Sequence, residues 1–268
     1  MTAPAAQPPA PRSSHVVLRS LGMGAPLRWL ALGLRDMARA PAVGLFYGAC
    51  FWLMAAVLGW VFRTQPEYTM SMASGCLLLG PFLAMGLYDA SRRHEAGQAA
   101  HLGQSLVCWH SHMGSMGMLV LVLIVLELLW GRASLVVFAV FFNTGMPSTT
   151  GVAQAVFNPE NWEFVAVYTV VGGAFAALVF SSTVVSIPMI LDRDTDAMTA
   201  AITSMRVVLE NPGVMLWWGA LITLLVGLSL WPWGAGLLVT GPLLGHASWH
   251  AYRAALEPMA PMEPVSSE

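Results

Sequence analysis

Two pairs of residues, each spaced four apart, carry the side chains best suited to hold a metal ion or a haem. His246 and His250 form one pair, and Cys108 and His112 form the other. Residues four apart share one face of an α-helix, so each pair can offer two ligands to one ion. Imidazole and thiolate are ligands of zinc, copper and haem iron. The other interpretation, which we favour, is that these histidines form structural hydrogen bonds at a membrane interface.

Soft copper ligands are also concentrated in residues 110–118, whose sequence is HSHMGSMGM. Thioether and imidazole groups suit copper. However, the chain has 17 methionines, and methionine is a common filler of apolar interiors. We therefore predict no bound cofactor, with copper or haem as the less favoured alternative.

The sequence lacks the motifs of the common enzyme classes. It contains no nucleophile elbow, phosphate-binding loop, zinc-protease helix or nucleotide-binding fingerprint. Hydroxyl side chains do gather near a proline in residues 181–188 (SSTVVSIP). They can bond back to helix carbonyls or line a substrate path, and we favour packing. We predict that the chain is not an enzyme.

The composition indicates that lipid surrounds most of these side chains. Hydrophobic residues make up 57% of the chain and charged residues 10%, whereas soluble proteins have about 25% charged residues. About 20 apolar residues cross the hydrocarbon core. The predicted fold class is therefore all-α, a polytopic membrane protein whose first partner is the lipid bilayer. A net charge of −2 gives no support to nucleic-acid binding.

Six transmembrane helices are predicted. They cover residues 42–62, 70–90, 113–130, 164–191, 214–230 and 234–252. Residues 134–142 either lengthen the third span or lie at the interface, and residues 143–162 form a polar loop. All twelve basic residues are arginines, and only Arg63 and Arg132 fall on the side opposite to the other ten. Because cytoplasmic segments carry the excess of arginine and lysine, both termini are predicted to be cytoplasmic.

An internal repeat organises the chain. Residues 35–48 (RDMARAPAVGLFYG) align without gaps with residues 206–219 (RVVLENPGVMLWWG). Residues 80–92 (GPFLAMGLYDASR) likewise align with residues 241–253 (GPLLGHASWHAYR). A weaker copy begins near His101. The repeat predicts three parallel helical hairpins related by an axis along the membrane normal.

Each hairpin is predicted to follow an amphipathic lead-in helix that lies in the membrane interface. The predicted apolar stripes of these helices are Leu27, Leu30, Leu34 and Met37; Leu102, Leu106, Trp109 and Met113; and Met198, Ile202, Met205 and Leu209. The repeat units are residues 26–97, 98–196 and 197–256, which together form one membrane domain of residues 26–256. Disordered tails are expected at residues 1–25 and 257–268.

The repeat also predicts a polar cluster at the cytoplasmic ends of the second and sixth spans. Asp89 aligns with His250, and these residues come three positions before Arg92 and Arg253. An ionisable group inside a membrane is a candidate for function. Pairing of an acid with an arginine three residues later is the structural alternative, which we favour.

The GPxLxxxxxxxxR pattern of residues 80–92 and 241–253, with LDRD at 191–194 and NPGVML at 211–216, resembles a known family. It is the family of predicted bacterial integral membrane proteins called domain of unknown function 2189. The resemblance covers roughly residues 26–256 and implies a protein of the bacterial inner membrane, with no catalytic residues to transfer.

Our leading functional hypothesis is a non-catalytic accessory, scaffold or assembly subunit of a larger membrane complex, for example a respiratory one. Its partners would be other integral membrane proteins. A small transporter or channel is the second hypothesis, favoured by the repeat and the polar fourth span. A copper- or haem-binding membrane protein is the third.

Overall fold

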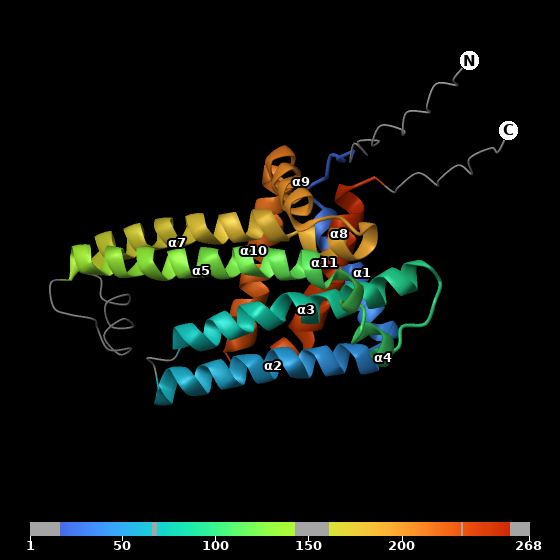
Figure 1. Cartoon of the computed structure of the whole chain (residues 1–268), viewed down its shortest axis with the longest axis horizontal. Coiled ribbons are helices and arrows are strands. Elements are labelled where there is room, and N and C mark those ends of the chain that lie inside the picture. The colour runs from blue at the N-terminus through green and yellow to red at the C-terminus, as the bar shows by residue number, and fades with distance from the viewer. Residues whose placement is uncertain (1–16, 66–68, 143–160, 232, 258–268) are drawn as a thin grey trace, which may run out of the picture.

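The computed structural model describes residues 17–65, 69–142, 161–231 and 233–257 (Figure 1). Apart from an isolated bridge between Leu18 and Leu256, the regular elements in these ranges are helices. They are α1 (Ala25–Arg39), α2 (Pro41–Thr64), α3 (Thr69–Glu95), α4 (Leu102–Ser105), a 3-10 helix (His110–His112), α5 (Met113–Phe141), α7 (Trp162–Thr183), α8 (Ser186–Arg193), α9 (Ala197–Glu210), α10 (Pro212–Leu230) and α11 (Leu237–Ala255).

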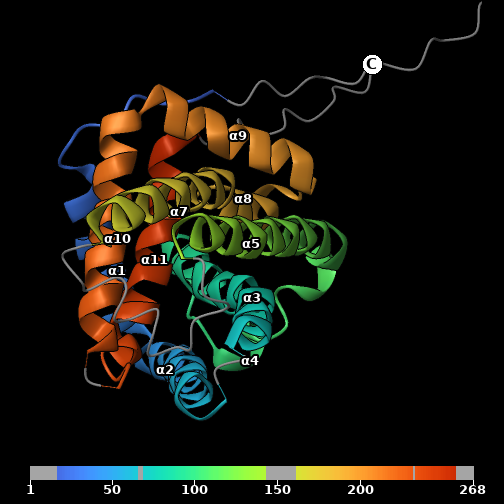
Figure 2. The same ribbon diagram turned by 90° about the vertical axis from the view of Figure 1, so that its left-hand side faces the viewer.

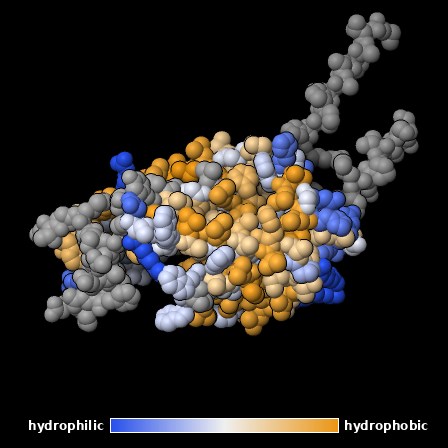
Figure 3. Space-filling view, turned by 90° about the horizontal axis from the view of Figure 1, so that it is seen from below, coloured by the Kyte–Doolittle hydropathy of each residue, from blue (hydrophilic) through white to orange (hydrophobic). Residues whose placement is uncertain are grey.

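Four segments of the described chain are long and apolar enough to cross a membrane. They are Pro41–Thr64, Leu102–Phe141, Trp162–Arg193 and Pro212–Leu230. Of the two alternatives for residues 134–142, the structure has the lengthened third span, because α5 continues as one helix of 29 residues to Phe141. Figure 3 shows a broad hydrophobic band between hydrophilic groups at the two ends of the long axis. The chain is therefore an all-helical, multi-pass membrane protein.

The predicted second and sixth spans, α3 and α11, do not meet this composition criterion. α11 lies among α1, α2, α3 and α10 (Figure 2). Eight of its 19 side chains are buried, including His246 and Trp249. Since protein rather than lipid surrounds much of α11, polar side chains can find hydrogen-bond partners there.

The third hairpin is arranged differently from the predicted parallel one. Figures 1 and 2 show α10 and α11 steeply inclined to α5 and α7. In this arrangement α11 lies in close backbone contact with α1. A Cβ atom at Gly33 would lie only 2.8 Å from the backbone nitrogen of Ala247. The turn between α10 and α11 still reaches the end of α2, where the Arg63 guanidinium lies 4.1 Å from the centre of the Trp233 ring.

The two strongest copies of the repeat share one local structure. α1 and α9 each end one residue before a cap, and a proline then begins the next helix at Pro41 or Pro212. The caps have nearly equal backbone angles, φ −130° and ψ 64° at Ala40 and φ −129° and ψ 51° at Asn211. Proline suits the first turn of a helix because the N–H that it lacks would have no intrahelical partner there.

The predicted lead-in helices are present in two of the three copies. α1 and α9 are continuous helices, whereas the middle copy has the short α4 and a 3-10 helix before α5. The second predicted apolar stripe, from Leu102 to Met113, therefore does not form on one continuous helix. This copy also lacks the proline that begins the next helix in the other two.

The predicted apolar stripes of α1 and α9 are only partly exposed, because Leu30, Met37 and Met205 are half-buried. Leu27 and Leu34 of α1 are 57% and 54% exposed, and Leu209 of α9 is 77% exposed. The fully buried positions of these helices carry other residues, of which several are small or polar and Trp29 is a large aromatic one. They are Pro26, Trp29, Gly33 and Asp36 on α1, and Ala197, Ala200, Thr203, Ser204 and Val207 on α9.

The predicted fourth span is broken into α7 and α8. The Thr183 hydroxyl donates to the Val179 carbonyl at 2.7 Å, and the Ser186 hydroxyl donates to the Ser182 carbonyl. At the break, the Val185 N–H donates to the Ser204 hydroxyl of α9 at 3.1 Å. The hydroxyl groups of this segment thus bond to helix carbonyls, and a hydroxyl of α9 bonds to the backbone at the break. This agrees with the packing role that we favoured over a substrate path.

Part of the predicted N-terminal tail is held by the folded domain. The Arg19 N–H donates to the Ala255 carbonyl at 2.9 Å, and the Leu21 N–H donates to the Asn211 side chain at 2.8 Å. The prediction of a disordered tail over residues 1–25 is therefore wrong for residues 18–21, because hydrogen bonds across the fold satisfy their backbone. Residues 1–16, the polar loop at 143–160 and residues 258–268 lie outside the described ranges.

Candidate functional site

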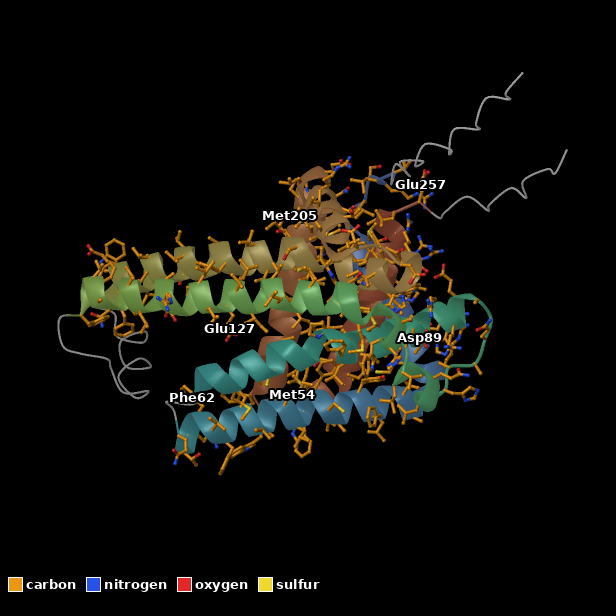
Figure 4. All side chains as sticks on the ribbon, in the orientation of Figure 1. Met54, Phe62, Asp89, Glu127, Met205 and Glu257 are labelled. Atoms are coloured by element: carbon orange, nitrogen blue, oxygen red, sulfur yellow. The ribbon has the colours of Figure 1, made fainter. Side chains whose placement is uncertain are left out.

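Polar side chains from four helices gather at one end of the molecule, where Figure 4 labels Asp89. We call this group the polar cluster. Its members are Asp36 of α1; Asp89, Ser91, Arg92, Arg93, His94 and Glu95 of α3; Asp192 and Arg193 of α8; and His246, Trp249, His250, Tyr252 and Arg253 of α11.

Asp89 is fully buried and has two arginine partners from its own helix. Arg92 donates to one carboxylate oxygen at 2.6 Å, and Arg93 donates to the other at 2.7 Å. Arg92 also donates to the carbonyl of Leu191 at 3.0 Å, which joins α3 to α8. The local pairing anticipated between Asp89 and Arg92 is present. Both carboxylate oxygens are satisfied by charge-assisted hydrogen bonds.

Arg253 and Glu95 join α11 to α3. The Arg253 guanidinium lies 3.0 Å from Glu95 and 3.5 Å from Asp192 of α8. Glu95 also accepts a hydrogen bond from the Trp249 indole at 3.1 Å. Asp192 accepts a second one from the Tyr252 hydroxyl at 2.6 Å. These interactions fasten three helices together at this end.

His250 is paired with Asp36 rather than with Asp89 or an arginine. Its Nε2 donates to the Asp36 carboxylate at 2.8 Å, and His94 Nδ1 lies 3.5 Å from the other oxygen. Burial acts to raise the pKa of Asp36, but hydrogen bonds from His250 and Ser91 outweigh it. The pKa of Asp36 is therefore lowered from its ordinary value of 3.8. The charged form of Asp36 is the stable one, and it joins α1, α3 and α11.

His246 has one clear partner. Its Nδ1 lies 2.8 Å from the Ser91 hydroxyl, and its side chain is fully buried. Its Nε2, like Nδ1 of His94, makes no hydrogen bond with the described residues. The imidazoles of His94 and His246 thus lie beside the Asp36–His250 pair. Such groups can exchange protons with one another or with a small ligand.

The four candidate metal ligands do not come together. His112 Nε2 lies 2.8 Å from Asp194, and its Nδ1 lies 3.2 Å from the backbone carbonyl of Cys108. His246 and His250 bind the separate partners already described. In the described ranges, no three His, Cys, Asp or Glu side chains are placed to hold a metal ion.

The methionines of residues 110–118 are also dispersed. Met116 is fully buried in the apolar core, whereas Met113 and Met118 are 52% and 55% exposed. These thioethers therefore lie in different surroundings, which does not favour one shared copper ion.

Sequence reasoning missed Asp36, His94 and Glu95 as members of the site. The Asp36–His250 and Glu95–Arg253 pairs join residues 214 and 158 positions apart. No spacing rule connects such residues. The one available signal for Asp36 was that it is the sole acid of an arginine-rich helix.

One known protein family matches the part of the chain that supplies α3 and α8 to this site. The family model called domain of unknown function 2189 (DUF2189), described as a predicted integral membrane protein, matches residues 68–192. Residues 68–192 are thus similar to the proteins of the DUF2189 family. The match is shorter than the 26–256 suggested by the motifs and leaves out NPGVML at 211–216. No curated protein matches the chain, and no solved structure does.

The DUF2189 segment contributes only part of the polar cluster. It contains Asp89, Glu95 and Asp192. Arg253, the partner of Glu95 and Asp192, lies outside it, as do Asp36 and His250, which pair with each other. The cluster therefore forms where the DUF2189 segment packs against α1 and α11.

Proposed function

We propose that this chain is a non-catalytic accessory, scaffold or assembly subunit of a larger complex in the bacterial inner membrane. The observation that carries the proposal is the pairing of the polar cluster. Asp89, Glu95, Asp192 and Arg253 bind one another or neighbouring arginines across α3, α8 and α11. Groups engaged in this way stabilise a helix arrangement, and this use of charge favours a structural role over a catalytic one.

Copurification from native membranes tests this function. The tagged chain, solubilised in mild detergent, is expected to elute with other integral membrane proteins in fixed stoichiometry. A matched preparation with an unrelated tagged six-span protein identifies non-specific partners. Elution as this chain alone, under conditions that preserve known complexes of the same membrane, would overturn the scaffold proposal.

We further propose six membrane spans, with both termini in the cytoplasm. Four exposed tryptophans support a membrane interface at the ends of these spans, because tryptophan is enriched at membrane interfaces. Trp60, Trp162, Trp231 and Trp233 are between 64% and 92% exposed and lie at helix ends. The arginines of the polar cluster would then face the cytoplasm, in agreement with the positive-inside rule.

Reporter fusions test the orientation. Fusions at positions 66, 155 and 233 are expected to report the periplasm, and a fusion after residue 257 the cytoplasm. A cytoplasmic signal at position 155 would contradict six spans.

A proton-coupled transporter or channel is the alternative, favoured by one observation. His246 Nε2 makes no hydrogen bond with the described residues, and it lies in a group with His94 and the Asp36–His250 pair to which α1, α3 and α11 all contribute. A pH-sensitive dye inside proteoliposomes tests it. Proton flux that is present in the wild type and lost in His246→Gln would replace the scaffold proposal with this one.

Copper or haem binding is the third proposal, which the dispersed ligands make less favourable. Metal content and optical absorbance of the purified protein test it. Metal or a haem band that disappears in the His246→Ala/His250→Ala double variant would support a cofactor.

A further inference from the structure

Helix α1 exposes two adjacent rows of residues of different character. Leu27, Ala31, Leu34 and Ala38 form an apolar row, and Arg28, Arg35 and Arg39 form a basic row about 100° around the helix. All seven residues are exposed. The third side of the helix, with Trp29, Gly33 and Asp36, is buried against the rest of the protein.

The basic row lacks acidic partners. In the part of the chain that the structure describes, neither Arg28 nor Arg35 forms an ion pair, and Arg39 lies at the 4.0 Å limit from Asp36. The single acid of α1 faces inward, where His250 holds it. The outward face of α1 therefore carries uncompensated positive charge beside exposed leucines.

Helix α9 provides an internal comparison. It occupies the same place in the repeat and also exposes its apolar stripe, with Met198 at 66% and Leu209 at 77%. Its one arginine, Arg206, aligns with Arg35 but lies 3.7 Å from Glu210. The outward face of α9 is thus apolar and close to neutral, so positive charge is particular to α1.

We propose that α1 binds the head groups of anionic phospholipids in the bilayer that surrounds the protein. The leucine row enters the acyl region and the arginine row contacts the phosphates, as in amphipathic helices that lie in a membrane interface. Pro41 begins α2 two residues after Arg39, which keeps α1 next to a membrane-spanning segment. This inference needs the chain to lie in a bilayer but does not depend on the scaffold role.

Native mass spectrometry of the purified full chain in detergent tests the proposal. The probes are dioleoyl-phosphatidylglycerol, which is anionic, and dioleoyl-phosphatidylcholine, which is not. The wild type is expected to bind the anionic lipid more tightly, and added sodium chloride should weaken that preference. Equal binding of the two lipids, or a preference that salt leaves unchanged, would overturn the proposal without any variant.

The Arg28→Gln/Arg35→Gln double variant locates the site. Each basic residue near an anionic surface contributes about a fivefold gain in binding, so the variant should bind phosphatidylglycerol about 25-fold more weakly. Binding of phosphatidylcholine should be unchanged, which also shows that the variant is folded. Arg206→Gln, the repeat-matched control, is expected to change phosphatidylglycerol binding less than twofold. Wild-type lipid preference in the double variant would place the site elsewhere.

A free anion is the other source of the same chemistry. Inorganic phosphate added in excess over the lipid, at constant ionic strength, is expected to leave phosphatidylglycerol bound, because phosphate cannot use the leucine row. Displacement of the lipid by phosphate under these conditions would indicate a site for a soluble anion and overturn the lipid assignment.

Discussion

At the scale of single residues, the protein uses buried charge in two ways. The Asp89 carboxylate is compensated locally, by arginines three and four positions later on the same helix. Asp36 is paired at long range with His250 of α11, and His94 of α3 lies 3.5 Å from its other carboxylate oxygen. In both cases a carboxylate with little or no exposure lies between partners, because a buried charge without a partner is costly.

Replacing Asp89 with asparagine should destabilise the fold. The change leaves Arg92 and Arg93 without their charged acceptor in a partly buried place, and we expect a loss of about 2 kcal/mol in the free energy of unfolding. The thermal unfolding midpoint in detergent measures it. Glu210→Gln is the control, since Glu210 is 49% exposed and pairs with Arg206 at the surface. If both variants melt like the wild type, the Asp89 pairs contribute no stability.

The lowered pKa of Asp36 predicts how stability depends on pH. Its contribution to stability is present above its unfolded-state pKa of about 3.8 and is lost as the pH falls through the lower folded-state value. Thermal unfolding between pH 6 and pH 3 should therefore show a steeper acid loss in the wild type than in Asp36→Asn. Equal slopes for the two proteins would contradict this assignment.

At the scale of elements, the chain changes direction where a neighbouring helix can satisfy the backbone. The break between α7 and α8 frees the Val185 N–H, and Ser204 of α9 accepts it. The joint between α9 and α10 is held by Asn211, whose side chain accepts from Leu21 and donates to the Arg19 carbonyl at 3.2 Å. Each irregular point is thus also a contact between segments distant in sequence.

Ser204→Ala should weaken the junction between α8 and α9. The Val185 N–H is buried and loses its acceptor, so we expect a loss of about 1 kcal/mol, measured as a lower unfolding midpoint. Ser181→Ala is the matched control, because Ser181 is exposed and bonds only to the Leu178 carbonyl of its own helix. Equal effects of the two substitutions would show that the interhelical bond is not needed.

At the scale of the whole molecule, α11 determines how the hairpins are assembled. α1 and α2 both cross it closely, at Gly33 and Gly48. α3 and α8 attach to its C-terminal half through the polar cluster. Glu95 and Asp192, which lie in the range that matches DUF2189, thus pair with Arg253 outside that range.

Gly33→Leu should prevent α1 from docking on α11. Even a Cβ atom at this position would lie 2.8 Å from the Ala247 nitrogen and 2.9 Å from the Leu243 carbonyl oxygen, so backbone would have to move. We expect faster cleavage in limited proteolysis of residues 17–40. Gly22→Leu is the control, since nothing lies within 4 Å of its Cβ position. Unchanged protection of this segment in Gly33→Leu would contradict the crossing.

The sequence by itself determined that lipid surrounds much of the chain, that the fold is helical, and where α2 and α10 begin. These features follow from local physics. Runs of apolar residues require lipid or burial, and Pro41 and Pro212 suit the first turn of a helix. The same locality explains why pairing of Asp89 with Arg92 was foreseen from their spacing. Only the tertiary structure decided which residues of the apolar stripes of α1 and α9 are exposed, and that His250 binds Asp36.

Only the tertiary structure also decided the inclination of the third hairpin. A stripe of leucines indicates an apolar environment without saying whether it is lipid or protein. A pair such as Asp36 and His250, 214 positions apart, depends on where helices cross. The position of the crossing depends in turn on a glycine such as Gly33, which has no side chain and so allows two helix backbones to come into contact.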